Sequence, residues 1–467
     1  MSGLISDILR NAQSLNLHAR TVETAGHNLA NQNDPAYARQ RTAPKEASTI
    51  YTTFGLQPGG VTSWGREHAR SLILDKQVVR GQGEVAYAEA QRDTRENLQV
   101  ALGEEIDRKS STASLDTIPD SDTVEGSLSK AIDEFFNAFQ ELSSNPGDPS
   151  AKEVLFQKSE ILTTRFNIVD KRVEEVRSNL QEKVADEIEK VEDLLDKIST
   201  LNERIYKLEF RKQGLAVDMR DERQKAIEEL AGLVSVEMAP INDSVIGISA
   251  KTDDGQDVLL VGLDGRVGEI VDADGQLTFD PLRGSIAGII DSEAAIDKLK
   301  NENLDLLAQQ LVTSVNAAYN DGSADNFFDA DSITAGGLKL DGSLTPGAIR
   351  SSNTSFSGAN DIALSISELA DKKFSQNNDD LIEGTFGEFI ASTAARVGQD
   401  LRTADADLET YQLAETRIQQ DREQLGAVNV DEEVTDLMRY QRAFQGTSKV
   451  IGVLDQLLET VVTSLVR

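Results

Sequence analysis

The sequences ISDILRNAQSLNLHARTVETAGHNL (residues 5–29) and FQGTSKVIGVLDQLLETVVTSL (residues 444–465) decide the fold of this chain. In both, apolar or small side chains recur at alternating steps of three and four residues, the spacing of a coiled-coil seam. The positions are Ile5, Ile8, Ala12, Leu15, Ala19, Val22, Gly26 and Leu29, then Phe444, Thr447, Ile451, Leu454, Leu458, Val461 and Leu465. A terminal helix with an apolar stripe needs a partner to cover it. We therefore expect the two ends to pair with each other and with the same stripes on neighbouring molecules.

Composition argues against several classes of function. Lys and Arg number 47 against 80 Asp and Glu, so the net charge is −33, which would repel a phosphate backbone or an anionic bilayer. No apolar run approaches the roughly 20 residues that span a bilayer. There is no cysteine, which excludes disulfides, thiolate nucleophiles and Cys-ligated zinc. The first residues lack the basic and apolar regions of a cleaved signal peptide.

Helical periodicity dominates the part of the sequence between the two ends. It predicts helices near 72–105 and 128–142, a long helix over 151–212, another from 286 to 319, and a second long helix over 390–425 that should lie antiparallel to the first. Residues 31–44 are rich in turn formers and an extended segment follows them. Residues 110–127 form a polar linker. Residues 320–380 read as loops.

Between residues 233 and 282 the spacing of apolar residues is no longer helical. Short β-prone runs there are separated by Asp-Gly pairs at 254–255, 264–265 and 274–275, a strong hairpin signal. The predicted fold class is therefore mainly α with a small β insertion: an elongated multi-domain chain with a terminal coiled coil, a long antiparallel helical bundle and a small antiparallel β domain. The expected parts are a terminal helix (1–40) that packs with the C-terminal helix (427–467), a bundle in two parts (41–232 and 284–426), and the β insertion (233–283).

The sequence gives little support to catalysis. His18, His27 and His68 have no two-histidine zinc spacing and are expected to be solvated or at the edge of a seam. Asp272 and Asp274 match only part of a calcium loop, so hairpin turns are the favoured interpretation. Gly81 to Ala86 matches a dinucleotide fingerprint but follows a helical pattern rather than a strand. We expect no enzyme activity, no cofactor, no metal and no catalytic residue.

Two short motifs resemble the ends of flagellar axial proteins. Residues 25–31, AGHNLAN, followed by Tyr37-Ala38-Arg39, are similar to the amino-terminal signature of rod, hook and hook-associated proteins. Residues 426–433, GAVNVDEE, with Tyr440-Gln441, Phe444 and Lys449-Val450-Ile451, look like the matching carboxyl end. Where these families commonly carry Thr-x-Gly before the tyrosine, this chain has Asp34-Pro35-Ala36, so its turn should be built differently.

Three internal segments narrow the resemblance to the flagellar hook-associated protein 1 (FlgK) family. They are Ser127 to Pro146 with its Phe135-Phe136-Asn137-Ala138-Phe139 core, Asp218 to Arg223 followed by Glu228-Glu229-Leu230, and Leu340 to Arg350. The resemblance spans nearly the whole chain, in the family's order. It implies a structural protein of the hook–filament junction that assembles through its terminal helices. The alternatives are another axial protein of hook or filament type and, more remotely, a cytosolic coiled-coil scaffold or a hydrolytic enzyme.

The resemblance also implies partners and a location. The partners would be copies of the chain in a ring or tube, the hook protein, a second junction protein of the hook-associated protein 3 type, and a cytoplasmic export chaperone on the C-terminal helix. The location would be the extracellular flagellum, reached by flagellar type III secretion without a cleaved signal peptide. In the free subunit the terminal helices are expected to be largely disordered. The expected assembly interface consists of Ile5, Ile8, Ala12, Leu15, Ala19, Val22, Asn28, Leu29, Asn31, Tyr37, Phe444, Ile451, Leu454, Leu458, Val461 and Leu465.

Overall fold

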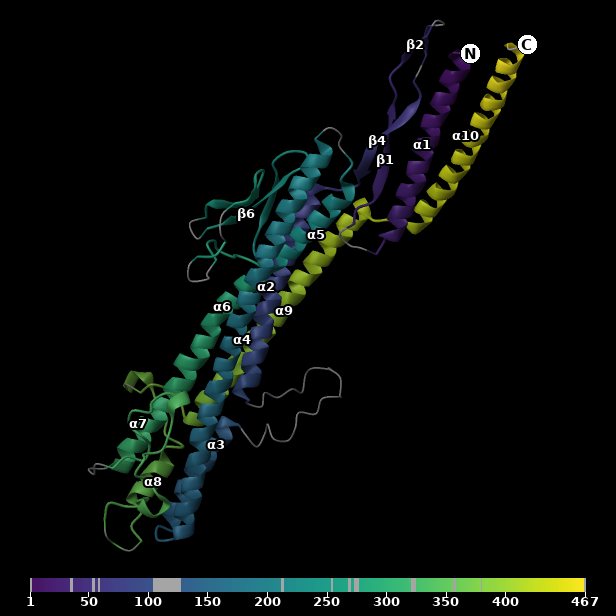
Figure 1. The fold of residues 1–467 in the computed structure, drawn as a ribbon. Coiled ribbons are helices and arrows are strands. Elements are labelled where there is room, and N and C mark those ends of the chain that lie inside the picture. Colours follow the sequence, from purple (N-terminus) through teal and green to yellow (C-terminus); the bar gives the residue numbers. More distant parts are fainter. Residues whose placement is uncertain are drawn as a thin grey trace. The chain divides into compact units, whose positions relative to one another are not determined.

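The chain forms two compact units in the computed structural model, which describes residues 2–33, 37–52, 55–57, 59–103, 127–210, 214–252, 255–267, 270–272, 277–320, 325–354, 356, 358–378 and 380–465. The first unit comprises Met1–Ala86, Glu187–Ser285 and Tyr411–Arg467, and the second comprises Tyr87–Asp186 and Ile286–Thr410. Three long helices contribute residues to both units: α2 (Leu72–Leu102), α4 (Pro149–Glu209) and α9 (Phe386–Gly426). Figure 1 shows the order of the elements along the chain.

The fold is mainly helical, as the periodicity predicts. The other α-helices are α1 (Ser2–Ala30), α3 (Leu128–Ser144), α5 (Val217–Leu233), α6 (Ser285–Asp297), α7 (Leu306–Asn320), α8 (Asp361–Glu368) and α10 (Val430–Leu465). The described residues also form the π-helix η1 (Lys298–Asp305) and the short 3-10 helices η2 (Ala335–Gly337), η3 (Pro346–Ala348) and η4 (Gln376–Asn378). The expected linker at 110–127 lies outside the described residues, apart from Ser127. Among the described residues, no helix combines the length and the hydropathy that a bilayer span requires.

The two longest helices, α4 and α9, both run from the second unit to the first. Both α4 and α9 begin in the second unit and end in the first, whereas α2 begins in the first unit and ends in the second. The prediction that α4 and α9 are antiparallel is therefore wrong. Its physical reason is connectivity: between them, the chain returns to the second unit through α6 and α7, so α4 and α9 are not the arms of one helical hairpin.

The core of the second unit is aromatic. Phe135, Phe136 and Phe139 of α3 are buried, and the Phe135 ring contacts those of Phe327 and Phe328 at 5.8 Å between centroids. Phe386, at the start of α9, stacks on Phe136. The Ser127 side chain caps α3 by accepting a hydrogen bond from the Lys130 backbone NH at 3.3 Å, which fixes where the helix begins.

The predicted β insertion is a four-stranded antiparallel sheet in the first unit. Its strands are β5 (Glu237–Pro240), β6 (Ile246–Lys251), β7 (Asp257–Gly262) and β8 (Gly265–Arg266), in that spatial order. The Asp264-Gly265 pair lies at the β7–β8 turn, where Gly265 has a positive φ of 113° that favours glycine. Residues 254, 274 and 275 of the other two Asp-Gly pairs lie outside the described residues.

A second β region follows α1 and was indicated in the sequence only as an extended segment. Strands β1 (Gln40–Glu46) and β4 (Val61–His68) pair antiparallel with a bulge at Ala43/Pro44, and β2 (Ile50–Thr52) pairs with β3 (Gly55–Gln57). These strands lack the alternation of apolar and polar residues that marks a half-buried strand. Helix α1 packs on β1 and β4, and this contact supplies the support that the local pattern does not indicate.

Candidate functional site

The two terminal helices lie side by side within one chain (Figure 1). On α1, a half-buried stripe runs through Leu4, Ile8, Asn11, Leu15, His18, Val22, Ala25 and Leu29, with Ala25 fully buried. The His18 ring of this stripe lies 6.2 Å from the Tyr440 ring of α10. On α10, the matching half-buried positions are Tyr440, Ala443, Thr447, Ile451, Leu454, Leu458 and Val461. The seven-residue register is thus present on both helices.

The structure divides the predicted interface residues between two faces of α1. Ile8, Leu15, Val22 and Leu29 belong to the half-buried stripe, whereas Ile5, Ala12 and Ala19 are exposed. Their places in the stripe are taken by Leu4, Asn11 and His18, two of them polar, which an apolar pattern cannot identify. On α10, Ile451, Leu454, Leu458 and Val461 are half-buried and Phe444 is exposed. Leu465 is the last residue of α10, and its side chain lies outside the described part of the chain.

Each terminal helix also presents apolar side chains to solvent. On α1 the exposed stripe contains Ile5 (49% exposed) and Leu9 (58%) together with Ala12, Ala19 and Gly26. On α10 it contains Val450 (47%), Val453 (56%) and Leu457 (50%), spaced three and four residues apart on one flank of the half-buried stripe. The intrachain pairing therefore covers only part of the apolar surface of these helices.

A polar joint ties the terminal pair to the rest of the first unit, and we define it as Asn28, Tyr37, Arg39, Gln40 and Glu433. Asn28 is 1% exposed and lies at its centre. Its Oδ1 accepts hydrogen bonds from the Tyr37 hydroxyl (2.8 Å) and the Gln40 backbone NH (3.0 Å). Its Nδ2 donates to the Gln40 carbonyl (2.9 Å) and to Glu433 Oε2 (3.1 Å). One amide thus connects α1, β1 and α10.

Arg39 makes the ionic contacts of the joint. Its Nε donates to Glu433 Oε1 at 2.6 Å and its Nη1 donates to Glu432 Oε2 at 2.8 Å. Burial lowers the pKa of Arg39, but the hydrogen bonds to Glu432 and Glu433 outweigh it and the pKa is raised. The Arg39 backbone NH donates to the Gly426 carbonyl at the end of α9 (2.9 Å), so both ends of the short α9–α10 connection are held.

The Tyr37 hydroxyl is a fixed hydrogen-bond donor. Burial, followed by the charges of Asp221 and Asp218, raises the pKa of Tyr37, so the hydroxyl remains protonated and donates to Asn28. Its ring lies 6.3 Å from that of His27. Asn31, also predicted as an interface residue, is half-buried, and its side chain lies 3.2 Å from His27 Nδ1. The unusual turn expected at residues 34–36 lies outside the described residues.

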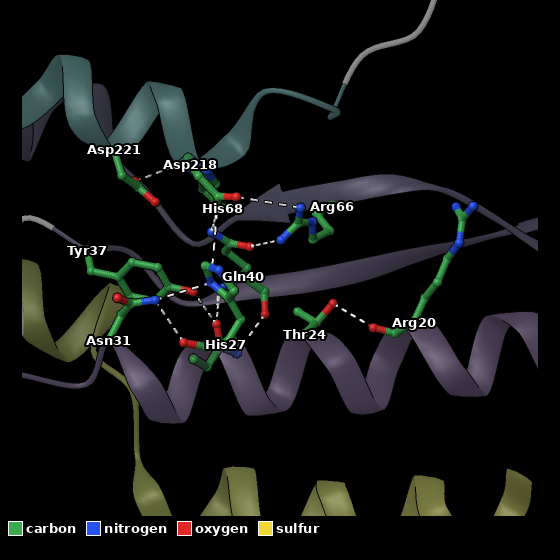
Figure 2. Close-up of polar contacts among 11 residues, drawn as sticks. Arg20, Thr24, His27, Asn31, Tyr37, Gln40, Arg66, His68, Asp218 and Asp221 are labelled. Atoms are coloured by element: carbon green, nitrogen blue, oxygen red, sulfur yellow. Dashed lines mark hydrogen bonds and ion pairs between the residues drawn. The ribbon is translucent and has the colours of Figure 1, made fainter.

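Polar contacts continue from the joint to α5, as Figure 2 shows. Gln40 Nε2 donates to Asp218 Oδ1 (2.9 Å), and Arg66 of β4 donates to Gln40 Oε1 (3.0 Å). His68 lies 3.7 Å from Asp221 with only 11% of its side chain exposed, so the expectation that it is solvated is wrong. Burial, then the charges of Arg70 and Arg220, lowers the pKa of His68 to about 3. Strand pairing of β1 with β4 is what carries this residue inward.

The α9–α10 connection is built on one glycine and one cap. A Cβ on Gly426 would lie 2.6 Å from the Ala69 carbonyl oxygen, so the chain needs glycine at this close approach. Asn429 Oδ1 accepts hydrogen bonds from the backbone NH groups of Asp431 (3.0 Å) and Glu432 (3.4 Å), which begins α10. A cavity of about 310 Å³ lies between this connection and the turn after α1.

Sequence reasoning found part of the joint. Asn28 and Tyr37 were predicted as interface residues, and Arg39 and Glu433 lie inside the motifs at residues 37–39 and 426–433. No sequence pattern predicted the contacts of Gln40, Arg66 and His68, because their partners are distant in sequence. Among the described residues, no three His, Cys, Asp or Glu side chains are grouped as a metal site. The arrangement of the joint is suited to holding helices at fixed positions.

Two family models and two curated proteins match this chain. The family described as flagellar hook-associated protein FlgK helical domain matches residues 112–328, and the family described as flagellar basal body rod FlgEFG protein C-terminal matches residues 427–465. Flagellar hook-associated protein 1 of Bacillus subtilis is 23% identical over 97% of both chains. Flagellar hook-associated protein 1 of Escherichia coli is 26% identical over 35% of this chain and 26% of its own.

One solved structure is also similar. The flagellar hook junction protein FlgK from Burkholderia pseudomallei is 17% identical with a TM-score of 0.42, and the match covers 54% of this chain and 46% of the solved one.

Proposed function

This chain belongs to the flagellar hook-associated protein 1 family, and we propose from this that it is a structural subunit of the bacterial flagellum at the junction between hook and filament. The match to the family's helical domain over residues 112–328 supports this role over that of a hook or filament protein. The match at residues 427–465 is to a rod protein family and supports only the wider axial group. The proposed role is structural and involves no catalysis.

The observation that carries the proposal is the uncovered apolar surface of the terminal helices. Ile5 and Leu9 on α1, and Val450, Val453 and Leu457 on α10, are exposed although each lies beside a half-buried intrachain stripe. At roughly 25 cal/mol per Å² of apolar surface, covering such side chains favours association. The two kinds of stripe therefore have different roles. The half-buried stripes pair α1 with α10, and the exposed stripes pack against neighbouring copies in a ring or tube.

The polar joint gives this assembly its geometry. Subunits can form a closed ring only if each terminal pair leaves its own subunit at the same angle. Hydrogen bonds of Asn28 to Gln40 and Glu433 connect α1, β1 and α10, Arg39 donates to Glu433, and the Gly426 carbonyl at the end of α9 accepts from the Arg39 backbone NH just before β1. The joint is in this way a positioning device for the assembly interface.

We also propose partners and an export route for this chain, on the basis of its resemblance to the family. The proposed neighbours are the hook protein on one side and a second junction protein, of the hook-associated protein 3 type, on the other. The proposed route is flagellar type III secretion without a cleaved signal peptide, with an export chaperone on α10 before secretion. Exposed apolar residues on α10 are consistent with a helix that is covered by one partner before export and by another afterwards.

A double variant on α10 tests the exposed stripe while leaving the half-buried stripe unchanged. In the double variant Val453→Asp and Leu457→Asp, charges enter the exposed flank and the intrachain stripe is retained. A strain that lacks the wild-type gene and carries this variant should form hooks without filaments, as counted by electron microscopy. The matched control is Ser448→Asp, which places a charge on the opposite, polar side of α10. Normal filaments with the double variant would refute the assigned role of the exposed flank.

A further inference from the structure

The exposed stripe of each terminal helix lies directly beside the half-buried stripe of the same helix. On α1, an exposed residue comes one position after a half-buried one, as Ile5 follows Leu4 and Leu9 follows Ile8. On α10 the order is reversed: the exposed residues come one position before the half-buried Ile451, Leu454 and Leu458, and they are Val450, Val453 and Leu457. Successive residues of an α-helix lie roughly 100° apart around its axis. Each exposed stripe is therefore turned by about this angle from the stripe that faces the partner helix.

The two helices run antiparallel, and this decides where the exposed stripes lie. His18 contacts Tyr440, and Asn28, later on α1, contacts Glu433, earlier on α10. Figure 1 shows both chain ends at the same end of the pair. Seen from that end, a step forward along α1 and a step backward along α10 turn in the same sense. Because the half-buried stripes face each other, equal turns away from them lead to opposite sides of the pair.

The two exposed stripes also lie at the same level along the pair. Ile5 on α1 and Val453 on α10 are equally many residues away from the contact between His18 and Tyr440. Both helices rise by the same distance per residue, so the two side chains are at the same height. The pair thus carries two apolar surfaces back to back, one from each helix.

The other flank of α10 is polar at this level. The residues one position after the half-buried Thr447, Leu454 and Leu458 are Ser448, Asp455 and Glu459, and all three are exposed. The exposed apolar residues of that flank, Phe444 and Val462, lie before and after this polar segment. A neighbour that covers apolar surface between residues 448 and 459 is therefore expected on the flank of Val450, Val453 and Leu457.

The other flank of α1 is covered within the chain. Thr24, one position before the half-buried stripe, has its Oγ1 3.1 Å from Thr42 Oγ1 of β1. Asn28, also one position before the stripe, donates to the Gln40 carbonyl of the same strand. The flank that contains Ile5 and Leu9 faces away from this strand and remains open to a neighbour.

We propose that the exposed stripe of α1 in one copy packs on the exposed stripe of α10 in the next copy, with Ile5 and Leu9 against Val450, Val453 and Leu457. This inference rests on the proposed function and specifies which surfaces of two copies meet. Because the stripes lie on opposite sides of the pair, the contact repeats head to tail and can close into a ring. A contact of α10 with α10 would instead be two-fold, would join only two copies and would leave Ile5 and Leu9 uncovered.

Cross-linking through introduced cysteines tests the contact, since the chain has no cysteine of its own. The full-length double variant Ile5→Cys and Val453→Cys replaces the wild type in a flagellated strain, and isolated flagella are treated with a short bis-maleimide. The head-to-tail contact should give a ladder of multimers on a denaturing gel. Ile5→Cys alone and Val453→Cys alone should each give only monomer. Dimers from either single variant would overturn the proposal, and so would the absence of a ladder from the double variant in flagella that contain it.

The matched control combines Ile5→Cys with Asp455→Cys. Asp455 follows the half-buried Leu454 and so lies on the same side of the pair as Ile5. The bis-maleimide should link these two positions within one chain and give no ladder, and a ladder as long as that of Ile5→Cys with Val453→Cys would overturn the assignment of sides. If the first double variant does not enter flagella, Leu9→Cys with Val450→Cys tests the same contact.

Failure of this contact and failure of the proposed function give different results. Immunogold electron microscopy of the wild-type chain locates it on the flagellum. Its absence from the junction between hook and filament would refute the proposed function, and the contact with it. Its presence there, together with dimers from a single-cysteine variant, would leave the proposed function intact and overturn only the head-to-tail contact.

Discussion

At the scale of single residues, Asn28 of the amino-terminal motif joins the two ends of the chain through hydrogen bonds. Its amide uses both donor hydrogens and both acceptor positions of Oδ1 on Tyr37, Gln40 and Glu433. A buried polar side chain is retained in a core only when its partners are in place. Its partner Glu433 is far along the chain, so Asn28 can be satisfied only when both chain ends have come together.

The first prediction concerns this amide. Asn28→Ala should lower the free energy of unfolding of the first unit by about 2–3 kcal/mol, because the buried Gln40 NH and the Glu433 carboxylate lose a partner. Urea unfolding followed by the fluorescence of Trp64, the single tryptophan, measures the change. The control is Asn16→Ala on the exposed side of α1, where little change is expected. If both variants unfold at the same urea concentration, the joint does not stabilise the unit.

The second prediction is a pH dependence caused by His68. Its pKa is lowered to about 3 in the folded chain, so between about pH 6.5 and pH 3 the unfolded state binds a proton that the folded state does not. Stability is therefore complete above pH 6.5 and falls as the pH falls, by about 1.4 kcal/mol per unit. The groups that face His68 are Arg70, Arg220, Asp218 and Asp221.

Unfolding of the wild type and of His68→Gln from pH 7 to pH 5 measures this effect. Over that range the wild type should lose about 2 kcal/mol through this residue, and His68→Gln should lose correspondingly less. His27→Gln, close to the joint, is the matched control. An unchanged slope in His68→Gln would contradict the assignment.

At the scale of elements, α1 and α10 each carry more apolar surface than one partner helix can cover. Most predicted seam positions lie in the half-buried stripes of the two helices, whereas Ile5, Ala12, Ala19 and Phe444 are exposed. On α1 the inward stripe contains Asn11 and His18, and Ile5 lies outside it. A period of seven residues specifies that a stripe exists, but α1 contacts β1 and β4 as well as α10, so the period alone does not specify which side chains each partner covers.

The third prediction compares two glycines at this scale. Gly426→Ala should lower the free energy of unfolding by about 1–3 kcal/mol, because its Cβ would meet the Ala69 carbonyl at 2.6 Å and the α9–α10 connection would have to shift. Gly452→Ala within α10 has open space around its Cβ and should raise helix stability by up to about 1 kcal/mol. Urea unfolding of both variants measures the pair. Equal effects of the two substitutions would refute the close approach at Gly426.

At the scale of the whole molecule, the terminal helices that we propose to assemble and the large aromatic cluster belong to different units. The terminal helices and the joint belong to the first unit. The large aromatic cluster of Phe135, Phe327 and Phe328 belongs to the second and is complete within it. Loss of a terminal helix should therefore leave the second unit intact.

The fourth prediction follows from this division. A chain that ends at Asn429 lacks α10 and with it Glu433, the partner of Asn28 and Arg39. Hydrogen exchange should show protection of α3 and α7 like that of the full chain, with lost protection in α1. The same truncation should abolish filament growth in a complementation assay. Filaments on hooks made with the truncated chain would contradict the role given to α10, and loss of protection in α3 would contradict the independence of the second unit.

The sequence by itself determined the long helices, the β insertion and the resemblance to the flagellar hook-associated protein 1 family. Helical period and Asp-Gly turns are local properties, since they depend on residues within a few positions of one another. Only the tertiary structure decided the parallel course of α4 and α9, the flank of α1 that faces α10, the inward position of His68 and the convergence on Asn28. Each of these depends on contacts between residues far apart in sequence, and a pattern of local spacing contains no information about which distant residues will meet.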